Sequence, residues 1–478
     1  MATTFSFAHQ TLFEPAQAEE ILRAVPASPG VVALWGESGE PYLTRAADLR
    51  RRLRRLLAPP EARDEYGRAV LSKRLNLRDR VRTLGWTSTG SEFESILLLY
   101  HATSELFGQE PARKRLRLHP PAFVRLTLEH AYPRVYVTHK LSPRALEHTF
   151  GPFPSRVAAE RYCDAVLDLF KLRRCSEELE VSPQHPGCAY GEMKKCMEPC
   201  KIACTDEEYA AEARSVQAFF ATRGESLLHE VAVARDAASE AMDFERAAEL
   251  HTRWEKVKAA TTLADELVRA IPELRALVLQ QAAHLSTPDE GAQEEAAVFL
   301  LERGQITAPA RLSTLGVRAV REQTAVGSSL FAQPLMLAPV PLHEPESPAA
   351  ALITQSPEDR LRSTLAQLES AAAEEPSLAV RCDYLALFRR WYYRPEKQRT
   401  GEVFLPGADG SWPLRRILNG AARVVLGPPK EISPVDREAA AALRKTKVLH
   451  EGREGVERVV PVLPKRRSRK SATTQELP

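Results

Sequence analysis

The sequence predicts a multidomain protein of mixed α+β class. Its 478 residues correspond to roughly three ordinary domains. Short apolar runs of strand length alternate along the chain with amphipathic helical stretches, and five of the seven cysteines crowd into residues 175–204. Hydrophobic residues make up 44% of the chain and charged residues 27%, close to a globular average, which argues against wholesale disorder.

The first predicted module covers residues 24–110. Val31–Trp35 is a short apolar run and Tyr42–Leu43 begins a return strand after a turn, which together predict a hairpin. Asp48 is placed to cap a helix whose leucines recur at helical spacing. A second amphipathic helix is predicted over Glu92–Phe107.

A connecting β/α segment is predicted over 111–174. Residues 122–138 alternate apolar and polar side chains, as strands do. Gly151–Ser155 (GPFPS) is predicted to be a loop, followed by a helix that ends near Arg174.

Beyond the cysteines the sequence becomes strongly helical, then β-like, then helical again. Two helices are expected to join at Met242–Asp243, with Asp243 as the N-cap of the second. The later segments are a helical hairpin, a small β-containing domain, a proline-rich linker, a C-terminal helical region and a basic, largely disordered tail, at 205–258, 259–333, 334–355, 356–430 and 431–478.

Arginine outnumbers lysine 51 to 15, and six arginines fall between Arg45 and Arg55. The guanidinium group is a rigid donor fork suited to phosphate, so this cluster predicts a surface that binds a polyanion such as DNA. The alternative is an arginine-rich composition on solvated helix faces. The predicted DNA-binding residues are Arg45, Arg50, Arg51, Arg54 and Arg55.

The clustered cysteines follow the pattern C-x12-C-x7-C-x3-C-x3-C. In a reducing compartment such crowding favours metal binding over disulfides, and an iron–sulfur cluster or a zinc ion would both satisfy the count. The alternative is a set of small buried residues. No apolar run is long enough to cross a membrane and no secretion signal is evident, so we expect a cytoplasmic protein without a membrane partner. No small-molecule substrate is evident either.

The order of features in the first half is specific. It runs from Gly151–Ser155 through Phe170–Arg173, the spaced cysteines and Glu207–Tyr209 to Met242–Leu250. This order resembles the C subunit of the bacterial nucleotide excision repair endonuclease, UvrC, and its shorter relative Cho, over residues 24–258. The resemblance implies an N-terminal GIY-YIG nuclease module, a cysteine-bound iron–sulfur cluster and a UVR helical hairpin that contacts UvrB.

The resemblance implies that the nuclease module is degenerate. Tyr42 and Arg52 match two of the family's active-site positions, whereas Val32, Leu99 and Lys114 stand where the family has other residues. Leu99 replaces the glutamate that binds the metal. Phosphodiester hydrolysis of this type needs a carboxylate to hold a divalent ion, so Mg²⁺ would be a cofactor only if the module is active.

The same resemblance assigns the remaining motifs. Cys175, Cys188, Cys196 and Cys200 match the cluster ligands, Cys204 is extra, and the expected cofactor is [4Fe–4S] with zinc as the alternative. The partner-binding positions of the UVR hairpin are Phe244, Ala247, Ala248 and Leu250. The alternative is that this hairpin packs only within its own chain.

The second half departs further from the family. UvrC carries an RNase H-like nuclease there, and residues 274–315 could be its opening strands, in a truncated form. No aspartate lies in Leu274–Gln280 or Ala296–Leu301, which argues against a second nuclease.

Together these features predict a UvrC-like repair protein that binds damaged duplex DNA and docks a UvrB-type partner, with its nuclease activity lost. Two alternatives remain, an active Cho-like endonuclease that makes a single incision and an interaction scaffold that does not bind DNA. Whether the protein is an enzyme is therefore left open.

Overall fold

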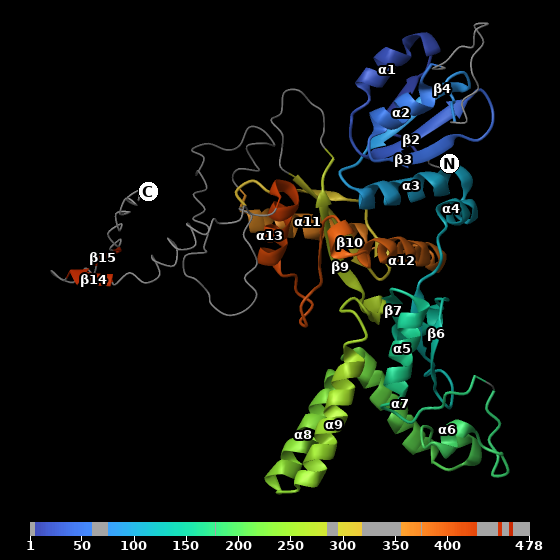
Figure 1. Cartoon of the computed structure of the whole chain (residues 1–478), viewed down its shortest axis with the longest axis vertical. Coiled ribbons are helices and arrows are strands. Elements are labelled where there is room, and N and C mark those ends of the chain that lie inside the picture. Colours follow the sequence, from blue (N-terminus) through green and yellow to red (C-terminus); the bar gives the residue numbers. More distant parts are fainter. Residues whose placement is uncertain are drawn as a thin grey trace, which may run out of the picture. The chain divides into compact units, whose positions relative to one another are not determined.

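The computed structural model divides the chain after Gly427 and forms three small antiparallel sheets before that point (Figure 1). This division, and the mixture of helices with several small sheets, confirm the predicted multidomain α+β class. The described residues are 5–59, 75–176, 178–283, 295–317, 355–373 and 375–427, with the backbone of two short strands at 448–451 and 458–461.

The first sheet has the strand order β1-β4-β2-β3. Its strands are β1 (His9–Leu12), β2 (Gly30–Gly36), β3 (Tyr42–Ala46) and β4 (Val81–Ser88). The predicted hairpin is confirmed, since β2 and β3 pair antiparallel. The sequence analysis missed β1, which has four residues and no buried side chain and so carries no apolar alternation.

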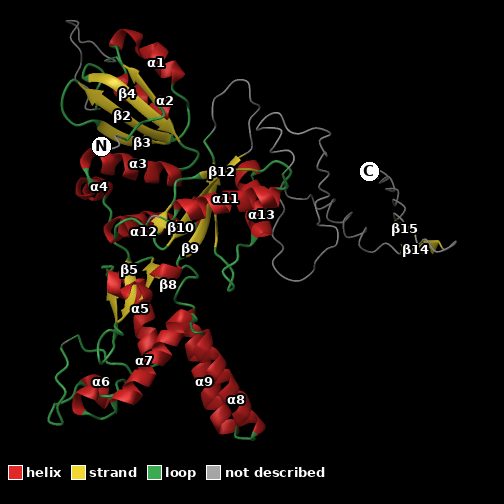
Figure 2. Ribbon diagram, turned by 180° about the vertical axis from the view of Figure 1, so that it is seen from behind, coloured by secondary structure: helices red, strands yellow, loops and turns green. Residues whose placement is uncertain are grey.

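Helices cover both faces of this sheet (Figure 2). Those that pack on the sheet are α1 (Ala18–Ala24), α2 (Leu49–Leu57) and α3 (Glu92–Phe107). The short η1 (Pro15–Gln17) precedes α1, and α4 (Gln109–Leu116) follows α3. Alternate residues of β2 face opposite sides: Val32 packs with the leucines of α2, whereas Val31 packs against α3. Asp48 caps α2 as predicted, since its carboxylate accepts a 2.8 Å hydrogen bond from the Arg51 N–H.

The second sheet has the order β6-β5-β7-β8. Its elements are β5 (Ala122–Leu126), β6 (Val135–Thr138), η2 (Pro143–His148), β7 (Thr149–Phe153), α5 (Arg156–Leu167) and β8 (Arg269–Ala270). The loop predicted at Gly151–Ser155 is wrong for its first three residues, which end β7. Pro152 is tolerated there because the β5–β7 register shifts opposite it, where a missing N–H breaks no regular ladder bond. The helix also ends at Leu167 rather than near Arg174.

A helical region follows, with α6 (Ala189–Glu192), η3 (Pro199–Lys201), α7 (Asp206–Ala221), α8 (Glu225–Glu240) and α9 (Phe244–Thr261). The last two lie side by side as a hairpin (Figure 1). Asp243 caps α9 as predicted, by accepting a hydrogen bond from the Arg246 N–H at 3.0 Å. Side chains of α7 and of the hairpin base share one core with α5 and the second sheet, which includes Phe150 and Val257.

The third sheet has the order β11-β10-β9-β13, with β12 also paired to β10. Its elements are η4 (Ile271–Glu273), β9 (Arg275–Gln281), β10 (Glu295–Glu302), β11 (Gln305–Ile306), β12 (Ala310–Ser313), α11 (Pro357–Ala371), α12 (Leu378–Tyr392), η5 (Glu396–Gln398), β13 (Glu402–Phe404) and α13 (Leu414–Leu426). Side chains of α11 and α13 cover one face, and side chains of α12 and α3 cover the other. Residues 259–333, expected to be β-containing, and residues 356–430, expected to be helical, therefore both contribute strands to this one sheet.

Other predicted segments fall largely outside the described residues. The proline-rich linker lies there up to residue 354, and so does most of the predicted disordered tail. Within that tail the structure describes one antiparallel pair, β14 (Val448–Glu451) with β15 (Arg458–Pro461). No helix among the described residues is both long and apolar enough to cross a membrane.

Candidate functional site

The two retained family positions meet in the first module. Tyr42 lies on β3 and Arg52 on α2, and the Arg52 Nη2 donates a 2.9 Å hydrogen bond to the Tyr42 hydroxyl. Both side chains are half-buried. Packing of the α2 leucines against β2 turns the opposite, arginine-bearing face of α2 away from the core.

A basic pocket of about 380 Å³ opens between the end of β3 and α2. It is lined by Arg45, Ala46, Ala47, Asp48, Arg51, Arg52 and Arg55. The one carboxylate in this lining belongs to Asp48, which is engaged in capping α2. The pocket therefore offers guanidinium donors in excess of acceptors, which suits an anion.

The structure separates the predicted DNA-binding arginines into two groups. Arg45, Arg51, Arg54 and Arg55 are exposed. Arg50 is instead half-buried, and it donates to the carbonyl oxygens of Val25 at 2.7 Å and Arg23 at 3.2 Å. These bonds use its guanidinium to hold α2 against the C-terminal end of α1, so Arg50 has fewer donors left for a ligand than its exposed neighbours.

Three substituted family positions lie apart from the Tyr42–Arg52 pair. Leu99 packs with Val31 on the α3 face of the sheet, opposite to the α2 face. Val32 is fully buried in the core beneath α2. Lys114 is exposed on α4. None of the three gives the pair a carboxylate.

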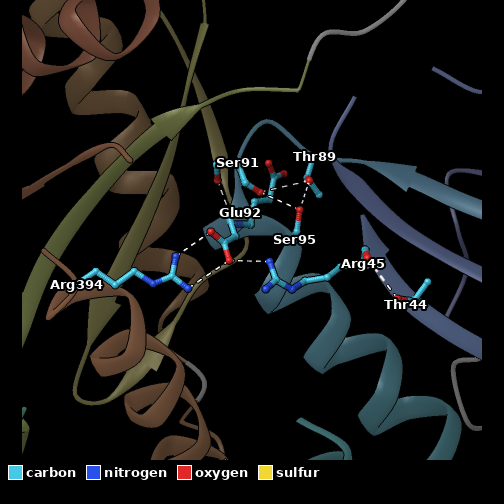
Figure 3. A network of polar contacts seen from close by, with 8 residues as sticks. Thr44, Arg45, Thr89, Ser91, Glu92, Ser95 and Arg394 are labelled. Carbon is cyan, nitrogen blue, oxygen red and sulfur yellow. Dashed lines mark hydrogen bonds and ion pairs between the residues drawn. The ribbon is translucent and has the colours of Figure 1, made fainter. Parts of the chain in front are cut away.

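Glu92 is the acidic side chain that reaches Arg45, and Figure 3 shows it between two arginines. Its Oε1 lies 2.7 Å from Arg45 Nη1, and its Oε2 lies 2.8 Å from Arg394 Nη1. Arg394 follows α12 and also approaches Oε1 at 3.2 Å. These bonds, that of Arg394 first, hold the pKa of Glu92 below its usual value against the opposing effect of burial. The carboxylate is thus ionised but already satisfied by two cations.

Glu94 is engaged by the start of its own helix. Its Oε2 accepts a 2.7 Å hydrogen bond from the Gly90 N–H, while Ser91 caps α3 by accepting from the Glu94 N–H. Thr89 and Ser95 form a 2.5 Å hydroxyl contact beside it (Figure 3). Burial raises the pKa of Glu94, with the Gly90 hydrogen bond opposing the rise. A half-buried carboxylate that already accepts a backbone hydrogen bond is a poor candidate for a metal ligand.

The cysteines expected to hold a cluster lie on loops between α5 and α7. Cys196 and Cys200 are buried, and Cys175 and Cys188 are half-buried. Cys188, Cys175 and Cys200 each add to the rise of the Cys196 pKa, so all three lie in its neighbourhood. Burial is the main cause that raises the Cys196 pKa to about 11, and the Glu198 N–H, 3.4 Å from its Sγ, opposes this rise.

The proximity of these thiols to Cys196 does not by itself make a metal centre. Among the described residues, no group of three or more His, Cys, Asp or Glu side chains is arranged to hold a metal ion. The donor set still has the right chemistry for a thiolate-bound group, and binding would have to displace the thiol protons. Cys204 differs from the other four, because Glu208 and Asp206 add to burial in raising its pKa. This acidic setting disfavours its thiolate.

The predicted partner-binding side chains of the hairpin are not equivalent. Phe244 is 69% exposed, and Ala248 is also exposed, whereas Ala247 is half-buried. Leu250 is only 6% exposed and packs in the core shared with the second sheet. It therefore supports the hairpin from inside. Met242, which the predicted set did not include, is 78% exposed at the turn beside Phe244.

Comparison with known families bears on the cysteine segment and the sheet before it. Residues 122–219 match the family model of the UvrC/Cho excinuclease middle domain. Over about half of its length the chain is similar to UvrC proteins. It is 26% identical over 288 residues to the UvrABC system protein C of Rhodospirillum rubrum, which covers 59% of this chain and 42% of that protein.

Other UvrC proteins show similar coverage. That of Carboxydothermus hydrogenoformans is 29% identical over 48% of this chain and 36% of its own length, and that of Caulobacter vibrioides is 26% identical over 60% and 42%. The chain thus matches about two fifths of the length of these curated UvrC relatives. No solved structure matches it.

Sequence reasoning missed the residues that join the first module to the third sheet. Asp383, 4% exposed on α12, accepts hydrogen bonds from the Tyr100 hydroxyl and from Arg113 Nε, each at 2.8 Å. Arg394 makes the second connection, through Glu92. The partners lie 270 or more positions apart, so no local pattern could have indicated these pairs.

Proposed function

We propose that this UvrC relative is an excision-repair factor that binds DNA through the basic pocket and does not cut it with the first module. The observation that carries the proposal is the pocket itself. Four arginines line it, and its one lining carboxylate is engaged in a helix cap. Guanidinium groups arranged in this way favour phosphodiester oxygens.

Among the described residues, the carboxylates near the Tyr42–Arg52 pair are already engaged, which supports the second half of the proposal. Metal-assisted hydrolysis needs a carboxylate that holds a divalent ion against the scissile phosphate. Glu92 is satisfied by Arg45 and Arg394, and Glu94 by Gly90. Leu99 offers no oxygen and packs on the other face of the sheet.

Two measurements on the full chain test this proposal. In the first, DNA binding is followed against salt, with Arg51→Gln/Arg55→Gln compared to the exposed control Arg253→Gln on α9. We expect weaker binding and a salt slope reduced by about 2 for the double variant alone. Salt-independent binding, or no binding, would instead favour the scaffold.

The second measurement is incision of damaged and undamaged duplexes with Mg²⁺ or Mn²⁺, alone and with UvrB. We expect binding without incision. Metal-dependent cutting that Tyr42→Phe or Arg52→Ala abolishes would contradict the proposal and establish the Cho-like endonuclease, in which the Arg52–Tyr42 contact acts on the reacting phosphate.

We further propose that Cys175, Cys188, Cys196 and Cys200 hold a [4Fe–4S] cluster, whose chemistry would be structural or electron-transferring. The position of the other three thiols in the neighbourhood of Cys196 supports this set, and the acidic surroundings of Cys204 argue against including it. Iron and sulfide analysis after anaerobic purification should show loss of the cluster in Cys196→Ser and retention in the matched control Cys204→Ser. Stoichiometric zinc would replace the iron–sulfur assignment, and metal-free folded protein would refute both.

The hairpin is proposed to dock a UvrB-type partner through its exposed tip. Phe244 and Met242 present apolar surface to solvent there, which is typical of an interaction site. A pull-down with UvrB should lose signal in Phe244→Ala with the fold intact. Undiminished binding would mean that the hairpin packs only within its own chain.

A further inference from the structure

A second cavity, of about 660 Å³, lies where the second and third sheets meet. Its walls come from the C-terminal end of α7, the segment around β8, the end of α12 and the chain between β13 and α13. No residue of the basic pocket lines it. Its volume falls in the range of about 300–1,000 Å³ that is typical of small-ligand sites.

Three half-buried arginines face this cavity without an acidic partner. They are Arg223, Arg269 and Arg399. Arg269 makes one long bond, 3.5 Å from Nε to the Glu266 carbonyl oxygen, and Arg399 donates to the Tyr392 carbonyl oxygen at 3.0 Å. Within the described part of the chain, none of the three guanidinium groups forms an ion pair.

Two of these cations repel each other. The pKa of Arg269 is lowered first by burial and next by the charge of Arg223. Placing two like charges together in a partly desolvated wall is unfavourable unless an anion compensates them. The surrounding sequence does not provide that anion at hydrogen-bond distance.

Three acidic residues also line this cavity. Glu225, Glu266 and Glu273 are all exposed, so solvent screens their charge. Glu266 and Glu273 do counteract the lowering of the Arg269 pKa, but each does so less than Arg223 contributes to it. The half-buried charges of the lining are therefore positive, and its negative charges are exposed to solvent.

We propose that this cavity binds the phosphate of a nucleotide, either free or within a nucleic-acid strand, between Arg223 and Arg269. A planar guanidinium fork matches phosphate oxygens in pairs, and the cavity volume admits a nucleoside with its phosphate. Recognition is of the phosphate rather than of the base. The Tyr392 ring that lines the cavity is stacked on Phe388, and Arg399 covers it at 5.2 Å, so it offers no free stacking face.

The test is calorimetric titration of the full chain with two probes, dAMP and a 5′-phosphorylated single-stranded hexanucleotide. We expect saturable binding of at least one probe, and its Kd should rise at least about tenfold in Arg223→Gln/Arg269→Gln. Binding of dAMP would indicate a free nucleotide, and binding of the hexanucleotide alone would indicate a strand.

A matched control accompanies these titrations. Arg415→Gln, whose side chain is 87% exposed on α13, should leave both of them unchanged. Circular dichroism verifies folding, and Arg399→Gln provides a second variant if the double variant does not fold. Absence of saturable binding to either probe, or binding that survives these cavity substitutions, would overturn the proposal.

Discussion

Replacing Glu92 by glutamine should strengthen DNA binding at the basic pocket. In the native chain its carboxylate holds Arg45 at 2.7 Å, and Arg45 lines that pocket. A phosphate bound to the other side of the Arg45 guanidinium would lie about 6 Å from the carboxylate, one hydrogen-bond length beyond the arginine. Glu92→Gln removes that repulsion and leaves Arg45 to the phosphate.

The size of the effect follows from the exposure of the pair. The Arg45 and Glu92 side chains are 42% and 38% exposed, so a water-like dielectric applies. Two unit charges about 6 Å apart then repel by about 0.7 kcal/mol, which corresponds to a roughly threefold change in Kd. The gain should vanish as salt is raised towards 1 M, where the Debye length is about 3 Å and well below this separation.

Arg394→Gln should act in the opposite direction, although Arg394 does not line the pocket. With Arg394 removed, Glu92 has Arg45 as its remaining cation and binds it more fully. Fluorescence anisotropy with a labelled duplex at low and high salt measures all three proteins, and the double variant Glu92→Gln/Arg394→Gln should behave like Glu92→Gln. Weaker binding by Glu92→Gln, or stronger binding by Arg394→Gln, would refute this reasoning.

The Glu92–Arg45 ion pair should also make the stability of the chain depend on pH. The pKa of Glu92 is lowered in the folded state, so the stability it contributes is present above the unfolded value of about 4.3 and is lost as pH falls through the lowered value. The contribution should be about 1 kcal/mol or less, since the pair is partly exposed. Urea unfolding between pH 3 and pH 6 should therefore show a smaller pH dependence in Glu92→Gln than in the native chain.

Three further predictions concern packing. Leu250→Ala should destabilise the chain by about 2–5 kcal/mol in urea unfolding, whereas Phe244→Ala should change stability by less than about 0.5 kcal/mol, and equal costs would contradict the burial of Leu250. Gly90→Ala should cost about 2–3 kcal/mol, because the added Cβ would lie 1.9 Å from the Gln281 carbonyl oxygen; native-like unfolding would show that this approach is absent. Asp383→Ala should cost about 3–5 kcal/mol by leaving buried donors unpaired, and a loss below 1 kcal/mol would rule out its role as a bridge between α3 and α12.

The contacts of α12 explain why the second half of the chain bears on the first module. Besides the ion pair of Arg394, Arg390 donates to the carbonyl oxygens of Leu116 and Arg117 at the end of α4. The ring centroids of Phe93 on α3 and Trp391 on α12 lie 4.7 Å apart. The third sheet and its helices thus form part of the support of α3.

The sequence by itself determined the local elements of this protein. Asp48 capping α2, the bounds Glu92–Phe107 of α3 and the break at Asp243 all depend on neighbouring residues, because helix caps and apolar periodicity are set within one or two turns. The meeting of Tyr42 and Arg52 was also within reach, through family motifs ten positions apart.

Only the tertiary structure decided which charges remain available. Arg50 looks like its neighbours in sequence, yet two backbone carbonyls engage it. Glu92 is neutralised by Arg394 from 302 positions away, and β13 completes a sheet begun at β9 more than a hundred residues earlier. Such pairings leave no periodic trace in the chain, since they depend on how separate elements pack, and burial and ion pairing then decide which side chains can meet a ligand.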